Sequence, residues 1–384
     1  MNLYFILAIG LSAGLYILLN YYIGRKGLKI IKQYTVIKAI RWIYWIVFWV
    51  LSFSYFAGRI TIIPALIRNF LSDVGSYWLA LLLYILLMVC LIDIFRFGGK
   101  RIKHFKNLKK YKHTPLVSGL AVILTASVIV IYGVINASNP IIQRYEISVD
   151  KNAGIKSLHV AMVSDMHLNP SSGKAEIDRF IKQVNEISPD VLFLGGDIIV
   201  EDTDLPTGVY LADSLSKLKL KYGIYAVTGN HEYIGGTADW YEKVLSSSGV
   251  KVLRDNVAQI DNSIYIIGRE DKSIGMYNNK NRLPLTQLLN GIDKNKPLIL
   301  LDHQPNTLEE AENNNIDVQL SGHTHKGQMF PFTLITSLTY KLDWGIMKEN
   351  NFNLIVSSGY GTWGPPIRTG NTPEIIDLKI NFKQ

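Results

Sequence analysis

Apolar residues are distributed on two different scales along this chain of 384 residues. Up to about residue 136 they form long runs, each close to the ~20 residues that a helix needs to cross a bilayer. Beyond that point the apolar runs are short, rich in β-branched residues and separated by segments with helical spacing, which is typical of an α/β domain. The pattern predicts about four transmembrane helices, at 3–23, 37–57, 76–95 and 116–136, followed by an α/β domain.

The apolar runs have alternative interpretations. The first run has no basic residue before its core, so we expect an uncleaved helix rather than a cleaved signal peptide. The second run is short unless it includes Val36 to Arg41. Its aromatic residues suit the aromatic belt of a membrane interface, namely Trp42, Tyr44, Trp45 and Trp49. For each run the alternative is a helix buried in the core of a globular domain.

The charges are divided in the same way as the apolar residues. Up to Ser138 there are 16 Lys and Arg against Asp73 and Asp93, a formal charge of +14, so the rest carries −5 of the total +9. The basic residues gather in the loops before the second and fourth predicted spans, where they set topology or bind anionic head groups. Because positive loops stay in the cytoplasm, we expect a multi-pass protein of the cell membrane with an extracytoplasmic α/β domain. The acidic α/β part argues against binding to nucleic acid.

The sequence after the apolar runs divides further. We expect residues 137–156 to be a connector with an edge strand at Arg144 to Val149, and residues 157–384 to form a layered α/β domain. The single cysteine, Cys90, excludes an intrachain disulfide and a thiolate zinc cluster. The patterns predict helices at 174–188, 210–219, 239–248, 284–290 and 306–313, a mobile insert at 271–282, and strands at 263–268, 353–358 and 373–382.

Five of the predicted strands end in side chains that bind metals. One such ending arises easily by chance, but five in one chain do not. Side chains at i and i+2 of an extended segment lie on one side, and α/β sheets bind ligands at the carboxyl ends of their strands. The endings are Asp165-Met166-His167, Gly196-Asp197, Gly229-Asn230-His231-Glu232, Asp302-His303 and Gly322-His323-Thr324-His325.

In this order the endings resemble the motifs of the calcineurin-like metallophosphoesterases, and the resemblance covers roughly residues 140 to 384. It implies a layered β-sandwich flanked by helices and two divalent cations, for which manganese, iron and zinc are all suitable and manganese is favoured. It also implies that His231 protonates the leaving oxygen or steadies the phosphoryl group, with a hydrogen-bonded supporting role as the alternative. The implied ligands are Asp165, His167 and His325 for the first ion, Asn230, His303 and His323 for the second, and Asp197, with one oxygen for each ion, between them.

Several neighbouring residues have two interpretations. Asp302 is either a support for His303 or a simple strand-end carboxylate, and Glu232 is expected to cap its segment or orient its neighbours. Trp363 and Arg368 are candidates for phosphate or head-group contacts, or for packing. Lys326 departs from the glycine that is usual after the last motif, and a cation there would favour an anionic substrate.

The predicted membrane helices and the segments 252–256, 358–368 and 373–375 resemble the membrane-associated bacterial branch of the family. That branch includes YkuE-type phosphoesterases and UDP-2,3-diacylglucosamine pyrophosphatases. The resemblance implies a membrane-anchored dinuclear-metal phosphoesterase that hydrolyses a phosphate ester or anhydride of a lipid or lipid-linked intermediate. The alternatives are a surface-anchored phosphodiesterase for soluble nucleotides and a non-catalytic metal-containing sensor or binding protein. The sequence sets no oligomeric state.

Overall fold

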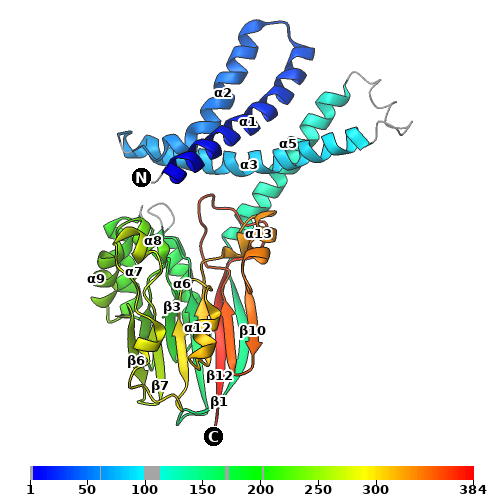
Figure 1. Ribbon diagram of the computed structural model, residues 1–384. Helices are drawn as coiled ribbons and strands as arrows, with labels where there is room; N and C mark the ends of the chain where they lie inside the picture. Colours follow the sequence, from blue (N-terminus) through cyan, green and yellow to red (C-terminus); the bar gives the residue numbers. More distant parts are fainter. Residues whose placement is uncertain (1–2, 61, 99–112, 169–172, 201–202) are drawn as a thin grey trace. The chain divides into compact units, whose positions relative to one another are not determined.

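The computed structural model describes residues 3–60, 62–98, 113–168, 173–200 and 203–384. They form two compact units, one of residues 1–135 with 364–367 and the other of residues 136–363 with 368–384. We call the second the catalytic unit because it contains the residues that the sequence predicts as metal ligands. The helices of the first unit, labelled in Figure 1, are α1 (Leu3–Tyr34), α2 (Lys38–Ala57), α3 (Ala65–Gly98) and α5 (Thr114–Ala137). The basic loop expected at 99–112 lies outside the described residues.

Three of these helices are long and apolar enough to cross a membrane: α2, α3 from Leu66, and α5. The first predicted span, 3–23, lies in α1 and stays a prediction. The helix α3 begins at Ala65 rather than near residue 76, because a helix continues through polar residues that end an apolar run. Tyr44 and Trp49, expected at an interface, pack on a buried cluster that includes Phe48.

The catalytic unit contains two mixed sheets of six strands each. Their orders are β1-β12-β2-β3-β4-β5 and β10-β11-β9-β8-β7-β6. The predicted edge strand is β1, which pairs in parallel with the closing strand β12. The strands are β1 (Ile141–Asn152), β2 (Ser157–Val163), β3 (Val191–Leu194), β4 (Ile224–Ala226), β5 (Lys251–Val252), β6 (Asn256–Ile260), β7 (Ile264–Gly268), β8 (Leu298–Leu301), β9 (Val318–Ser321), β10 (Gly345–Glu349), β11 (Phe352–Val356) and β12 (Glu374–Lys383).

The central strands are apolar throughout because both of their faces are buried. Alternate residues such as Val160 and Val191 in the first sheet, and Ile299 and Val318 in the second, share one buried cluster. The other faces pack against helices, with α6, α7 and α9 on the first sheet and α11 and α12 on the second. Each fully buried aliphatic side chain contributes about 1.5–3 kcal/mol. These helices are α6 (Gly173–Ile187), α7 (Leu205–Ser216), α9 (Ala238–Ser246), α11 (Leu285–Leu288) and α12 (Leu308–Asn313), close to the predicted ranges.

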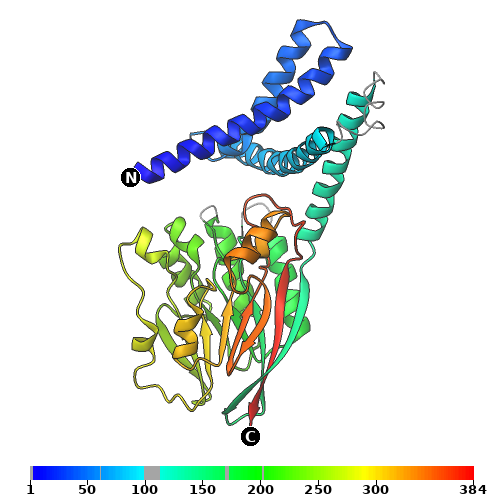
Figure 2. The same cartoon turned by 45° about the vertical axis from the view of Figure 1, so that its right-hand side comes forward.

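The strand directions bring the chemically interesting loops to one end of the unit. The strands β2, β3 and β4 are parallel to one another, as are β8 and β9. Their carboxyl ends lead into the loops 164–168, 195–200, 227–231, 302–304 and 322–327, and we call this end the site edge. The strand β12 is antiparallel to β2, so it ends at the opposite end of the unit, where Figure 2 shows the C terminus.

The sequence did not predict the short helices α8 (Asn230–Ile234) and α10 (Ile274–Tyr277), the helix α13 (Phe332–Thr339), or the strands β5, β6 and β10. The helix α10 lies inside the segment 271–282 that was predicted as a mobile insert. Three of the eight residues of α13 are Thr, a β-branched residue with low helix propensity, so the composition of this short segment did not indicate a helix.

Candidate metal centre

Three groups of side chains at the site edge bring their ligand atoms within 4.8 Å of one another. Because His167 and Asp197 each belong to two groups, the three groups form one continuous cluster. Asn230 joins it through its Oδ1 atom, which lies 2.7 Å from Nδ1 of His323. The structure therefore brings together the seven residues expected as ligands, and His231 with them. The groups are Asp165, His167 and His325; His167, Asp197 and His231; and Asp197, His303 and His323.

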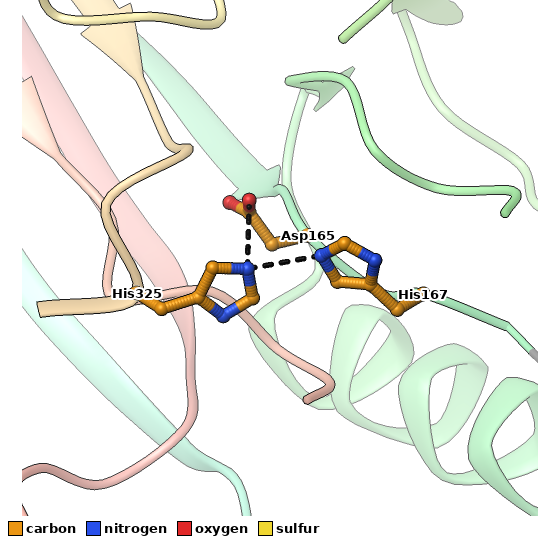
Figure 3. Close-up of side chains that lie close together, drawn as sticks. All are labelled: Asp165, His167 and His325. Carbon is orange, nitrogen blue, oxygen red and sulfur yellow. Dashed lines mark hydrogen bonds and ion pairs between the residues drawn. The ribbon is translucent and has the colours of Figure 1, made fainter. Parts of the chain in front are cut away.

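The first group, shown in Figure 3, joins loops from both sheets. Asp165 and His167 follow β2, and His325 begins the 3₁₀ helix η2 (His325–Gly327) after β9. Nε2 of His325 lies 2.9 Å from Nε2 of His167 and 3.3 Å from Oδ1 of Asp165. All three residues are buried, so their donor atoms face one another away from bulk water.

His303 offers the clearest sign of a missing partner in this cluster. Its Nδ1 lies 2.8 Å from the Gly195 carbonyl oxygen, and a hydrogen bond donated there turns Nε2 toward Asp197. Oδ2 of Asp197 lies 3.2 Å from Nε2 of His303, within ion-pair distance but without forming a hydrogen bond. Among the described residues Nε2 of His303 thus has no hydrogen-bond partner although it is buried. A buried nitrogen of this kind fits a metal ligand.

Asp197 lies between the two halves of the cluster. Its Oδ2 faces both His303, at 3.2 Å, and His167, at 3.9 Å. Its Oδ1 instead accepts a hydrogen bond of 2.8 Å from the backbone N–H of His231. A single oxygen of Asp197 thus faces both histidines, and the expectation that each oxygen serves one ion stays a prediction.

The electrostatics of the first group suit cation binding. Burial and the neighbouring His325 lower the pKa of His167 to about 3. Burial would raise the pKa of Asp165, but His325 and the other facing histidines hold it well below the usual range. A neutral imidazole and an ionised carboxylate are the forms in which these side chains bind metals.

The third group, Asp197, His303 and His323, carries a proton that a cation could replace. Burial and the nearby His303 lower the pKa of His323 to about 4. Burial opposes the charge on His303 too, but Asp197 raises the pKa of His303 well above its usual value. In return His303 keeps the pKa of Asp197 low. Metal binding releases such protons, so a positive charge is already favoured at this position.

The loops that hold the cluster have unusual backbone conformations. Five of its residues have left-handed φ angles, a conformation that costs on the order of 1–3 kcal/mol for a non-glycine residue and gathers at functional sites. Gly229 is required by close approach, because a Cβ atom there would lie 2.2 Å from Oδ1 of Asp197. The left-handed residues are Asp165 (54°), His167 (49°), Asp197 (51°), His323 (73°) and His325 (47°).

Glu232 supports two of these loops at once. Its buried carboxylate accepts hydrogen bonds from the backbone N–H groups of Asp197, Ile198 and Ile199 in one loop. A fourth hydrogen bond of 2.8 Å comes from Gly229 at the start of α8. Burial and the charge of Asp197 raise the pKa of Glu232 to about 7. Glu232 therefore caps its own helix and also orients the loop that carries Asp197.

The other candidates are placed as follows. Arg368 is fully buried, and its guanidinium donates to the carbonyl oxygens of Ser358, Gly359 and Gly361 while Nη2 approaches Nδ1 of His325 at 3.3 Å. The guanidinium thus holds the loop around the site and is not presented to a phosphate. Trp363 is 61% exposed.

Two further residues beside the ligands are held by specific partners. Both oxygens of Asp302 accept from Nη1 of Arg282, at 3.1 and 3.0 Å, so Asp302 anchors the segment that was expected to be mobile. The ammonium group of Lys326 lies 3.7 Å from the centre of the Trp344 ring. The Trp344 ring thus holds the ammonium group of the residue that follows His325.

Comparison with known proteins gives a consistent family. The family model described as calcineurin-like phosphoesterase matches residues 158–327. A transmembrane protein with metallophosphoesterase domain from Danio rerio is 30% identical over 333 residues, which cover 81% of this chain and 76% of that protein. An uncharacterized metallophosphoesterase of Aquifex aeolicus is 31% identical, over 63% of this chain and 92% of its own length. The uncharacterized metallophosphoesterase YkoQ of Bacillus subtilis is 29% identical, over 61% of this chain and 88% of its own length.

Proposed function

Because the chain belongs to the calcineurin-like metallophosphoesterases, we propose that the cluster at its site edge holds the dinuclear divalent metal centre that these hydrolases use. The donor set fits such ions, since it combines carboxylate, amide and imidazole ligands. Asp165, His167 and His325 would hold one ion, and Asn230, His303 and His323 would hold the other. Asp197 would lie between the two ions.

The observation that carries this proposal is the convergence of side chains from five strand ends. Residues as far apart as Asp165 and His325 place their donor atoms 3.3 Å from each other. Burying several histidines and carboxylates away from bulk water costs free energy unless further charges or hydrogen bonds offset the lost hydration. A pair of divalent cations supplies that compensation.

In the proposed reaction the ions would activate the nucleophile and a protein side chain would protonate the leaving group. Divalent ions polarise a bound phosphate and lower the pKa of water, so they supply a nucleophile near neutral pH. We propose that His231 is the general acid of the reaction. Its ring packs edge-on against His167, with 4.7 Å between the ring centres. The hydrogen bond from its backbone to Asp197 fixes the start of α8 beside the cluster. His231 donates a proton to the leaving oxygen as the ester or anhydride bond breaks.

The substrate that we favour is a phosphorylated lipid or lipid-linked intermediate. Apolar helices in the same chain hold the catalytic unit near a bilayer and raise the effective concentration of a lipid substrate. The second candidate is a soluble nucleotide or other phosphodiester, with the helices as an anchor only. Turnover of phosphorylated lipids in detergent micelles, compared with that of nucleotides, separates the two, and a preference for nucleotides would exclude the lipid substrate.

The organisation of the chain completes the proposal. We assign residues 1–136 to a bundle of four spans including the one in α1, 137–156 to a connector and edge strand, and 157–384 to a layered β-sandwich flanked by helices. The basic loops favour a catalytic unit outside the cytoplasm. A reporter fused to Gln384 in intact cells tests on which side of the membrane the catalytic unit lies. Activity of a reporter that works only in the cytoplasm would contradict an extracytoplasmic catalytic unit.

The role of His231 gives the first prediction. In full-length protein loaded with manganese, His231→Ala is expected to lower turnover of a phosphodiester with a poor, alkyl leaving group by about 10²–10⁴-fold. For a nitrophenyl leaving group, which needs no proton, the loss should be much smaller. Both rates are measured for wild type and variant at equal metal content.

The same assay tests the proposed function itself. Wild type that hydrolyses neither ester after loading with manganese, iron or zinc would contradict the enzyme and favour a sensor or binding protein. Equal losses for both leaving groups would instead give His231 a supporting role.

A further inference from the structure

Exposed hydrophobic side chains are distributed unevenly over the catalytic unit. Within its described residues, every exposed large hydrophobic residue lies on a segment that begins or ends at the site edge. Examples are Leu205 and Val209 in the first turns of α7, Ile234 at the end of α8 and Met276 in α10. The described turns at the opposite end, such as 150–156, 261–263 and 293–296, expose no large hydrophobic residue. Such a one-sided distribution marks a contact surface.

The helix α13 is the largest part of this surface. It follows the last ligand motif closely, and none of its residues is buried. Leu334, Ile335 and Leu338 are 56%, 59% and 88% exposed. Its polar Thr336 instead faces the protein and donates a hydrogen bond of 2.7 Å to Asp343. The helix therefore turns its apolar side outward, which is the arrangement of a helix that lies in a membrane interface.

The chain joins the catalytic unit at this same edge. The first residue of β1, Ile141, pairs with Glu374 at the start of β12, beside the carboxyl end of β2. Just before it, the side chain of Asn136 in the last turn of α5 donates to the carbonyl oxygens of Arg368 and Asn371, at 3.0 and 2.6 Å. Along the chain, only three residues separate the end of α5 at Ala137 from the start of β1 at Ile141.

We propose that the site edge rests on the bilayer surface, with α13 and the exposed Trp363 inserted among the lipid head groups. Trp363 is linked to the segment before α13 because its backbone N–H donates to Gln328 at 2.8 Å. Figure 2 shows α13 at the end of the unit away from the C terminus, as this placement requires. The metal centre then takes phosphates at head-group level, those of phosphorylated amphiphiles. This substrate class rests on the proposed function, whereas the membrane contact does not.

A fluorescence measurement tests the contact without any catalysis. Cys90→Ser is combined with Leu338→Cys in the full chain, which is labelled with a polarity-sensitive dye and reconstituted in vesicles of phosphatidylcholine and phosphatidylglycerol. We expect emission at shorter wavelength and quenching by lipids that carry spin labels near the head group. The control label at Lys383, at the opposite end of β12, should show neither.

Other outcomes overturn the proposal. A Leu338 label that is as solvent-exposed as the Lys383 label excludes insertion. A label that is shielded without lipid quenching, and that depends on protein concentration, indicates a second copy of the chain on this surface instead of the bilayer.

A paired activity measurement separates the membrane contact from the proposed function. For Leu334→Ser with Leu338→Ser, the ratio of lipid-phosphate turnover to soluble-diester turnover should fall about tenfold, because two apolar side chains no longer partition into lipid. An unchanged ratio contradicts the substrate class. If wild type hydrolyses neither substrate but the Leu338 label is quenched by the lipids, the proposed function is wrong, whereas the contact between α13 and the bilayer is supported.

Discussion

Replacing Asp197 by alanine is expected to lower phosphodiester turnover about a thousandfold or more, the largest effect that we predict for one residue. Its Oδ2 faces both His303 and His167, so the substitution removes a ligand from both halves of the cluster. Loss of several kcal/mol of transition-state stabilisation corresponds to a change of this size. Turnover of a nitrophenyl phosphodiester by the manganese-loaded full chain measures it.

Two controls separate this effect from misfolding. Asp213→Ala removes an exposed carboxylate on α7 that pairs only with Lys217 among the contacts described here, and should leave turnover unchanged. Circular dichroism of the Asp197 variant should match that of wild type. Equal turnover by Asp197→Ala and wild type would mean that the cluster has no part in hydrolysis.

Replacing Glu232 by alanine is expected to have the largest effect on stability. The substitution leaves four buried backbone N–H groups, those of Asp197, Ile198, Ile199 and Gly229, without their acceptor. Each unpaired buried donor costs about 1–3 kcal/mol, so we expect the catalytic unit to lose on the order of 4 kcal/mol or more. Hydrogen exchange of the amides at 197–199, with metal removed from both proteins, measures the loss.

The matched variant is Glu232→Gln. It keeps one acceptor oxygen and the shape of the side chain, so its loss of protection should be clearly smaller than that of Glu232→Ala. If both variants protect the amides at 197–199 as wild type does, the four hydrogen bonds do not hold the loop, and another interaction must position Asp197.

Sequence patterns predicted the parts of this molecule that depend on periodicity and strand direction. The apolar runs before Asp165, Asp197 and His303 gave buried strands, and parallel strands necessarily bring their carboxyl ends to one edge. The amphipathic spacing at 174–188 gave α6 for the same reason. These features follow from short-range rules that the sequence states directly.

Features that depend on tertiary contacts could not be predicted in the same way. Three hydrogen bonds join Glu232 to residues 197–199, more than 30 residues away in the chain, and Asp197 in that loop has a left-handed φ. Arg368 could be read as a phosphate ligand until its carbonyl partners were known. The helix α13 forms although three of its eight residues are Thr, which has a low intrinsic helix propensity.

The number of divalent ions bound per chain tests the central claim most directly. Purified full-length protein is stripped with a chelator, reloaded with manganese, freed of unbound ions, and analysed for metal and protein in the same sample. We expect two ions per chain in the wild type. One ion or none, after loading with iron and zinc as well, would contradict a dinuclear centre at the site edge.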